Sequence, residues 1–127
     1  MTFSTLQSGP YSSSPTQANF YITRIGNTVT LQLCSPILGT PEVAGSFRTS
    51  TPLPVRFRPI VHAGTALVPI YNNSPSDLST GIVTVDTDGY ITIQTLNMSN
   101  SGKFSASGQV GYRGFNMSYV IRSEIFG

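Results

Sequence analysis

The 127-residue sequence predicts an all-β fold, an antiparallel β-sandwich of the jelly-roll type. Three observations lead to this fold class: short runs in which apolar and polar residues alternate, turn-forming residues between the runs, and no segment with a helical period. Seven or eight short strands are expected. An immunoglobulin-like topology is less favoured, because the paired cysteines and the tryptophan that mark many such domains are absent.

The length is that of a single domain. Residues 1–17 are rich in Ser, Thr, Gly and Pro, which predicts an irregular lead-in segment rather than a packed element. Residues 18–127 are then predicted to form one β-sandwich domain. A hydrophobic fraction of 39% supplies enough apolar material for its core.

The first strands are predicted between residues 18 and 33. Two alternating runs lie there, and Gly26-Asn27 separates them. This pattern predicts a β-hairpin with a short Gly-Asn turn. In the first run Phe20 and Ile22 share one face, which Arg24 can extend, and in the second run Val29, Leu31 and Leu33 alternate with Thr28, Thr30 and Gln32.

Prolines interrupt the middle of the chain. Residues 35–54 contain four of them, which is too many for a helix or a central strand, so a long surface connection is expected, with at most a short edge strand at residues 45–48. Residues 66–71 then predict a strand. Its Pro69 must lie at an edge or a bulge, because proline has no N–H to donate to a ladder.

The clearest local signal lies in residues 81–96, where two alternating β-branched runs flank Asp88-Gly89. This pattern predicts a second β-hairpin. Further on, residues 103–107 predict a short strand, and residues 112–121 predict one long final strand. The apolar face of that strand consists of Phe115, Met117, Tyr119 and Ile121.

Charged residues are scarce, at 9% of the chain with a net charge of +2. No Lys/Arg cluster forms a phosphate-binding stripe, so no nucleic-acid partner is expected. The N-terminus lacks the pattern of a signal peptide, and no apolar stretch approaches the roughly 20 residues needed to span a bilayer, which predicts no membrane insertion. Cys34 is the only cysteine, so it can form no disulfide within the chain.

The sequence shows no credible catalytic set, and it predicts neither an enzyme nor a bound cofactor or metal. A hydrolase would require His62, the only histidine, within hydrogen-bond reach of a serine and a carboxylate. Residues 86–89 copy the middle of a calcium-binding loop, but the flanking positions do not follow, so a hairpin turn is favoured and weak calcium binding at Asp86 and Asp88 stays open. Use of the Asn-x-Ser sequons is also left open. These begin at Asn72, Asn97 and Asn116.

Two arginines and several tyrosines are the candidates for ligand binding. On an extended segment Arg56 and Arg58 would point to one side of Phe57, where their planar guanidinium groups suit an anionic sugar or a phosphate. The alternative is that they pair with neighbouring chains or with backbone carbonyls. The tyrosines are expected to be exposed and able to stack on sugars, although such residues more often cover a core edge or an interface. They are Tyr71, Tyr90 and Tyr112, with Tyr11 in the lead-in segment.

The order of several motifs is informative. They are Phe20-Tyr21-x-x-Arg24-Ile25-Gly26-Asn27-x-Val29-Thr30-Leu31, Leu53-Pro54-x-Arg56-Phe57-Arg58-Pro59, Pro69-Ile70-x-Asn72-Asn73, Gly81-x-Val83, Asp88-Gly89-x-Ile91-x-Ile93 and Ser118-Tyr119. Over about residues 18–121 this succession resembles the C-terminal head domains of viral fibre, spike and phage tail-fibre-like proteins. These are similar in outline to the trimeric heads that follow collagen-like or coiled-coil stalks. Residues 1–17 contain neither Gly-x-y triplets nor heptads, which leaves the mode of attachment open.

The resemblance implies a small jelly-roll head domain that assembles as a homotrimer on a virion surface and carries no catalytic residues. In one hypothesis, this head binds a host receptor, either a glycan or a protein, and three weak sites raise the avidity. In the other, the chain is a purely structural capsid or fibre component whose partners are other virion proteins. Exposed, sugar-competent aromatic residues would favour the first hypothesis, and burial of those residues in interfaces would favour the second.

Overall fold

The computed structural model describes residues 1–10, 16–33, 36–39, 41–60, 63–73, 78–96 and 102–121. These residues form ten β-strands and one short 3₁₀ helix, η1. In chain order the elements are β1 (Thr2–Ser8), β2 (Thr16–Ile25), β3 (Thr28–Leu33), β4 (Ile37–Gly39), β5 (Phe47–Thr49), η1 (Val55–Phe57), β6 (Gly64–Asn72), β7 (Leu78–Val85), β8 (Ile91–Thr95), β9 (Val110–Tyr112) and β10 (Phe115–Val120). No helix in the described ranges is long and apolar enough to cross a membrane.

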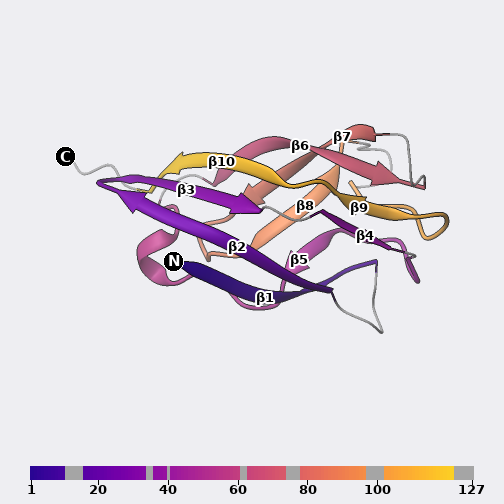
Figure 1. Cartoon of the computed structure of the whole chain (residues 1–127), viewed down its shortest axis with the longest axis horizontal. Coiled ribbons are helices and arrows are strands. Elements are labelled where there is room, and N and C mark those ends of the chain that lie inside the picture. The colour runs from indigo at the N-terminus through magenta and orange to yellow at the C-terminus, as the bar shows by residue number, and fades with distance from the viewer. Residues whose placement is uncertain are drawn as a thin grey trace.

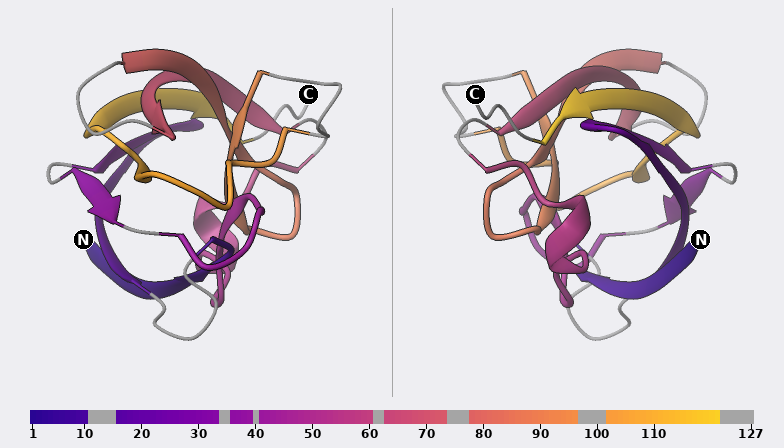
Figure 2. Two further views of the ribbon diagram at one scale, coloured as in Figure 1. Left: turned by 90° about the vertical axis from the view of Figure 1, so that its right-hand side faces the viewer. Right: turned by 90° about the vertical axis from the view of Figure 1, so that its left-hand side faces the viewer.

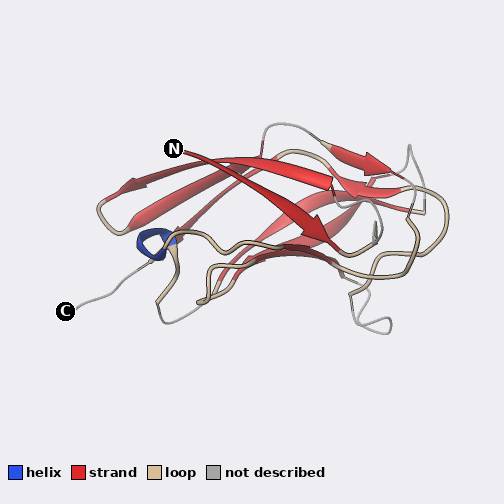
Figure 3. Cartoon of the chain, turned by 90° about the horizontal axis from the view of Figure 1, so that it is seen from below, coloured by secondary structure: helices blue, strands red, loops and turns tan. Residues whose placement is uncertain are grey.

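All the strand pairs are antiparallel, and the strands form one continuous sheet in the order β10-β3-β2-β1-β5-β8-β7-β6-β9-β4 (Figure 1). The sheet folds over into two facing layers (Figure 3). Seen along the strands, it encircles the core, because β1 pairs with β5 on one side and β10 packs beside β6 on the other (Figure 2). The predicted all-β, antiparallel fold class is confirmed.

Alternating side chains fill the space between the layers. In β10 every second residue is buried, and β8 shows the same period. This places Phe115, Met117, Tyr119 and Ile121 in the core, as predicted. At the centre, the Phe47 ring meets Phe104 and Tyr112 edge-on, with ring centroids 5.0 and 5.2 Å apart, an arrangement that aromatic pairs prefer.

Both predicted hairpins are confirmed. β2 and β3 pair from Ile25 and Thr28 onward, so Gly26-Asn27 is a two-residue turn, and Gly26 has φ 59, which glycine adopts without steric cost. β7 and β8 pair from Val85 and Ile91 onward. In the turn between them, Asp86 Oδ1 accepts hydrogen bonds from the backbone N–H groups of Asp88 and Tyr90, each at 3.0 Å.

The prediction of an irregular lead-in over residues 1–17 is wrong for most of the described part. Residues 2–8 form β1, which pairs with β2 on one side and β5 on the other. Its inward positions are occupied by Phe3, Thr5 and Gln7, of which two are polar. Because period-2 patterns are recognised by apolar residues, a buried strand with Thr and Gln on its inner face gives no such signal.

Three further expectations need correction. Residues 35–54 contain β4 and β5, and β5 lies inside the sheet between β1 and β8 rather than at an edge. Residues 103–107 contribute only an isolated bridge between Phe104 and Gly45. The final strand is divided into β9 and β10, which pair with different neighbours.

Pro69 lies where its missing N–H can be tolerated. It belongs to β6, one residue before the ladder between β6 and β9 begins at Ile70 and Tyr112. The Pro69 carbonyl accepts a hydrogen bond from the Arg113 backbone N–H at 3.0 Å on that side. The end of this ladder is the edge that the sequence predicted for the residue.

Candidate anion-binding site

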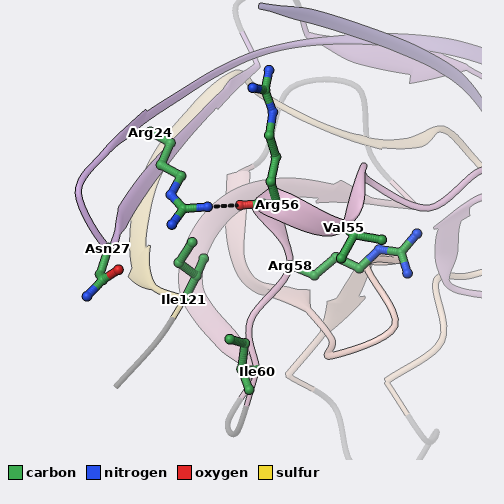
Figure 4. A pocket seen from close by; sticks show the side chains of 7 residues that line it. All are labelled: Arg24, Asn27, Val55, Arg56, Arg58, Ile60 and Ile121. Carbon is green, nitrogen blue, oxygen red and sulfur yellow. Dashed lines mark hydrogen bonds between the residues drawn. The ribbon is translucent and has the colours of Figure 1, made fainter. Parts of the chain in front are cut away.

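The predicted arginines lie at η1, close to the turn between β2 and β3. Arg56 is inside the 3₁₀ turn and Arg58 caps its end. The expectation that both guanidinium groups lie on one side of an extended segment is therefore wrong, because a 3₁₀ helix repeats every three residues and not every two. Figure 4 shows that the Arg56 and Arg58 side chains point away from each other.

A third arginine, Arg24, completes the cluster from the end of β2. Its Nε donates to the Gly26 carbonyl at 2.8 Å, and its Nη1 donates to the Arg56 carbonyl at 2.9 Å. These two bonds fix the plane of the guanidinium group, and its Nη2 has no hydrogen-bond partner in the described ranges. This role of Arg24 could not be predicted from the sequence, because Arg24 and Arg56 are 32 residues apart and no local pattern connects them.

Four backbone carbonyls hold the η1 segment in place. Besides the Arg24 bond, the Tyr119 hydroxyl donates to the Phe57 carbonyl at 2.7 Å, and Arg58 Nε donates to the Leu53 carbonyl at 2.6 Å. The Leu53 N–H in turn donates to the Gly89 carbonyl at 2.9 Å. Burial raises the pKa of Tyr119, because a phenolate would be poorly solvated there. The segment that carries Arg56 is thus tied to β2, β10 and the β7–β8 turn.

Two shallow hollows lie on either side of Arg24 and Arg56. The first, shown in Figure 4, has a volume of ≈ 380 Å³, and Ile60 and Ile121 give it apolar walls. The second has a volume of ≈ 460 Å³, and its lining includes Thr23. Arg24 and Arg56 line both hollows, so each hollow combines guanidinium groups with apolar or hydroxyl-bearing neighbours.

The arginine cluster carries positive charge that the described carboxylates do not neutralise. No ion pair joins Arg24, Arg56 or Arg58 to a carboxylate in the described ranges. The Arg56 guanidinium lies 4.7 Å from the centroid of the Phe57 ring, a cation–π contact that holds it over an apolar surface. A guanidinium group with N–H groups that have no partner in the described ranges is suited to a carboxylate or another planar anion.

Of the predicted tyrosines, Tyr71, Tyr90 and Tyr112 lie in the described ranges, and these three line neither hollow. The expectation that Tyr112 is exposed is wrong: its exposed fraction is 0%, and its hydroxyl donates to Gln7 Oε1 inside the core. Tyr90 is half-buried, and the Arg48 guanidinium covers one face of its ring at 4.2 Å. Tyr71 is half-buried on β6.

For the other residues singled out in the sequence, the structure answers only part of the question. His62, Cys34, Tyr11 and Asn97 lie outside the described residues, so the condition for a hydrolase stays open. Within the described ranges, no three His, Cys, Asp or Glu side chains gather as metal ligands. Of the remaining sequon residues, Asn72 uses its Oδ1 to accept the Ser105 N–H at 2.8 Å, and Asn116 is exposed on β10.

Comparisons with known proteins bear on the fold. No family model matches the sequence, and no curated protein matches it. Among solved structures, the reovirus attachment protein sigma1, in complex with α-2,3-sialyllactose, aligns with 96% of this chain and 65% of its own chain, with a TM-score of 0.59 and 14% sequence identity. The present chain thus spans about two thirds of the length of that chain. At this identity the likeness concerns the fold alone: the chain has a β-rich fold similar to that of this attachment protein.

Proposed function

We propose that this chain is the non-enzymatic head domain of a virion surface fibre or spike, that it assembles as a homotrimer, and that it binds a host receptor carrying an acidic glycan. The observation that carries the proposal is the likeness of fold over 96% of the chain to an attachment protein in complex with α-2,3-sialyllactose. That ligand contains a carboxylate. The arginine cluster supports the acidic class of glycan, because its guanidinium groups are suited to such a group.

The scarcity of charge supports self-association. Charged residues make up 9% of the chain, and the cores of subunit interfaces are depleted of charge. A homotrimer would present three copies of the Arg24–Arg56 site on one rigid body. Since linked sites raise the effective concentration of each other's ligand, contacts that are weak individually can then hold a virion to a cell surface.

The first test is the mass of the protein in solution, measured by light scattering coupled to size exclusion. A species of about three times the 13.6 kDa chain mass is expected. A monomer at micromolar concentration would remove the multivalent mechanism. The alternative function, a structural capsid or fibre component, predicts a multimer that binds neither glycans nor host-cell proteins.

The second test is a glycan array that pairs sialylated glycans with the same glycans after removal of the sialic acid. The wild-type head is expected to prefer the acidic members. Arg56→Ala is expected to weaken that binding about tenfold, the effect of losing roughly 1.4 kcal/mol at one contact. Arg48→Ala is the matched control, since Arg48 is an exposed arginine on β5 that lines neither hollow. Equal binding by the Arg56 and Arg48 variants would contradict a role for the cluster.

A further inference from the structure

A third hollow, at the opposite end of β3 and β10, combines polar groups of a different kind. It has a volume of ≈ 530 Å³. Its polar lining residues are Gln32, Arg113 and Asn116, and Pro36 and Phe115 form part of its apolar wall. We call this hollow the amide groove, after the two primary amides at its side.

The register of the sheet extends the amide groove into a row across three strands. Gln32 of β3 pairs with Asn116 of β10 on one side and with Tyr21 of β2 on the other. Directly paired residues of antiparallel strands project from the same face, and all three residues are exposed. Tyr21 has an exposed fraction of 52%. The Tyr21 ring therefore lies in one row with the Gln32 and Asn116 amides on an exposed face of the sheet.

The polar groups of this row have no partners in the part of the chain that the structure describes. No hydrogen bond or ion pair is found there for the side chains of Tyr21, Gln32, Asn116 and Arg113. The neighbouring rows differ, because their polar side chains bond to each other: Ser4 Oγ to Asn19 Oδ1 at 2.6 Å, and the hydroxyls of Thr30 and Ser118 at 3.1 Å. Among the described residues, the polar side chains of the adjacent rows therefore bond to each other, whereas those of the Tyr21 row do not.

We infer that the Tyr21–Gln32–Asn116 row and the amide groove form a binding subsite for a neutral pyranose sugar. Each primary amide offers two donors and an acceptor, which matches hydroxyl groups that both donate and accept. The Tyr21 ring offers a flat apolar surface for the C–H face of a sugar ring, and its hydroxyl adds a polar contact. Arg113 at the rim donates to further oxygens. A ligand that carries several charges is a poorer match, since Arg113 is the only charged side chain among the described residues that line the groove.

This subsite deepens the proposed function and rests on it, but it is distinct from the arginine cluster. Asn27 of the first hollow and Gln32 of the amide groove are separated by the length of β3, about 17 Å at the usual rise per residue. The two regions can therefore be altered independently. An acidic sugar at one region and a neutral sugar at the other would be recognised by different side chains.

The experiment is an NMR titration of the ¹⁵N-labelled head domain with lactose, a neutral disaccharide, run in parallel with the array of sialylated and desialylated glycans. In the wild type, saturable shifts are expected at the backbone amides of Tyr21, Gln32 and Asn116. Tyr21→Ala and Asn116→Ala are each expected to weaken lactose binding about tenfold. Leu67→Ala is the matched control for the loss of an exposed apolar side chain, and Arg56→Ala is the control for the other site; both are expected to bind lactose as the wild type does.

The outcomes separate the two proposals. The subsite is overturned if lactose produces no saturable shifts, or if the shifts are unchanged in Tyr21→Ala and Asn116→Ala. In that case, a preference for acidic glycans that depends on Arg56 still supports the proposed function. If the wild-type head binds neither acidic nor neutral glycans, the proposed glycan-binding function itself fails. If the wild-type head binds lactose but shows no preference for sialylated over desialylated glycans, the subsite is kept and the role of the arginine cluster is removed.

Discussion

The two ends of β3 use polar side chains in opposite ways. At the turn end, Arg24 and Arg58 donate hydrogen bonds to backbone carbonyls and hold the η1 segment in place. At the other end, Gln32, Arg113 and Asn116 line a groove, and their side chains bond to no side chain or carbonyl in the described ranges. A substitution at the turn end should therefore change stability as well as binding, whereas a substitution at the groove end should change binding alone.

The largest effect is expected for a residue directly below the groove. Tyr112 is fully buried, and its ring lies 6.4 Å from that of Phe115, which lines the groove. Tyr112→Ala should lower the free energy of unfolding by about 3–5 kcal/mol, because it leaves a cavity and removes the partner of Gln7. Urea denaturation measures this change. Tyr21→Ala, at the surface of the same end, should change the free energy by no more than about 0.5 kcal/mol; a loss as large as that of Tyr112→Ala would show that Tyr21 is part of the core.

An intermediate effect is expected for Tyr119, which ties β10 to η1 at the turn end. Tyr119→Phe removes the hydrogen bond to the Phe57 carbonyl and should cost about 1 kcal/mol near neutral pH. The pKa of Tyr119 is raised in the folded protein, so its contribution is fully present below the unfolded pKa of about 10 and is lost as the pH rises above that value. The dependence of unfolding free energy on alkaline pH should therefore be flatter for Tyr119→Phe than for the wild type. Parallel curves would contradict this assignment.

The smallest effect separates the arginines of the two ends. Arg24→Ala should lower the free energy of unfolding by about 0.5 kcal/mol, because its two hydrogen bonds are exposed to solvent and each contributes little. This corresponds to a fall in Tm of about 2 °C for a domain of this size. Arg113→Ala should leave Tm unchanged within the error of the measurement. Calorimetry of the two variants compares them directly, and equal shifts would remove the distinction between the two ends.

The strands that could be predicted from the sequence are those whose turn residues and alternating side chains lie next to each other in the chain. In both hairpins the turn residues and the alternating runs are contiguous, and in the first one the apolar residues assigned to a common face are buried. β1 and β5 could not be recognised in the same way. β1 buries Thr5 and Gln7, whose side chains form hydrogen bonds to residues at least 45 positions away in the chain, and β5 is only three residues long.

The case of Tyr112 shows how one local break changes the assignment of a side chain. In a continuous strand, Phe115 and Met117 on the inner face would place Tyr112 on the outer face, because side chains alternate. Residues 113 and 114 separate β9 from β10, so the alternation does not carry across them, and β9 is buried throughout. The same reasoning within β2 does hold: Phe20 and Ile22 point inward, so Tyr21 between them is exposed.

The sequence by itself determined that this chain is an antiparallel β-structure with hairpins at residues 20–33 and 81–96, since side-chain period and turn chemistry are properties of neighbouring residues. Only the tertiary structure decided which polar residues become neighbours: Arg24 bonds to the Arg56 carbonyl of η1, and Tyr21, Gln32 and Asn116 form a row across three strands. The physical reason is that strand pairing in this fold brings together residues far apart in the chain. Such non-local contacts depend on the register and order of the strands, which alternation alone does not specify.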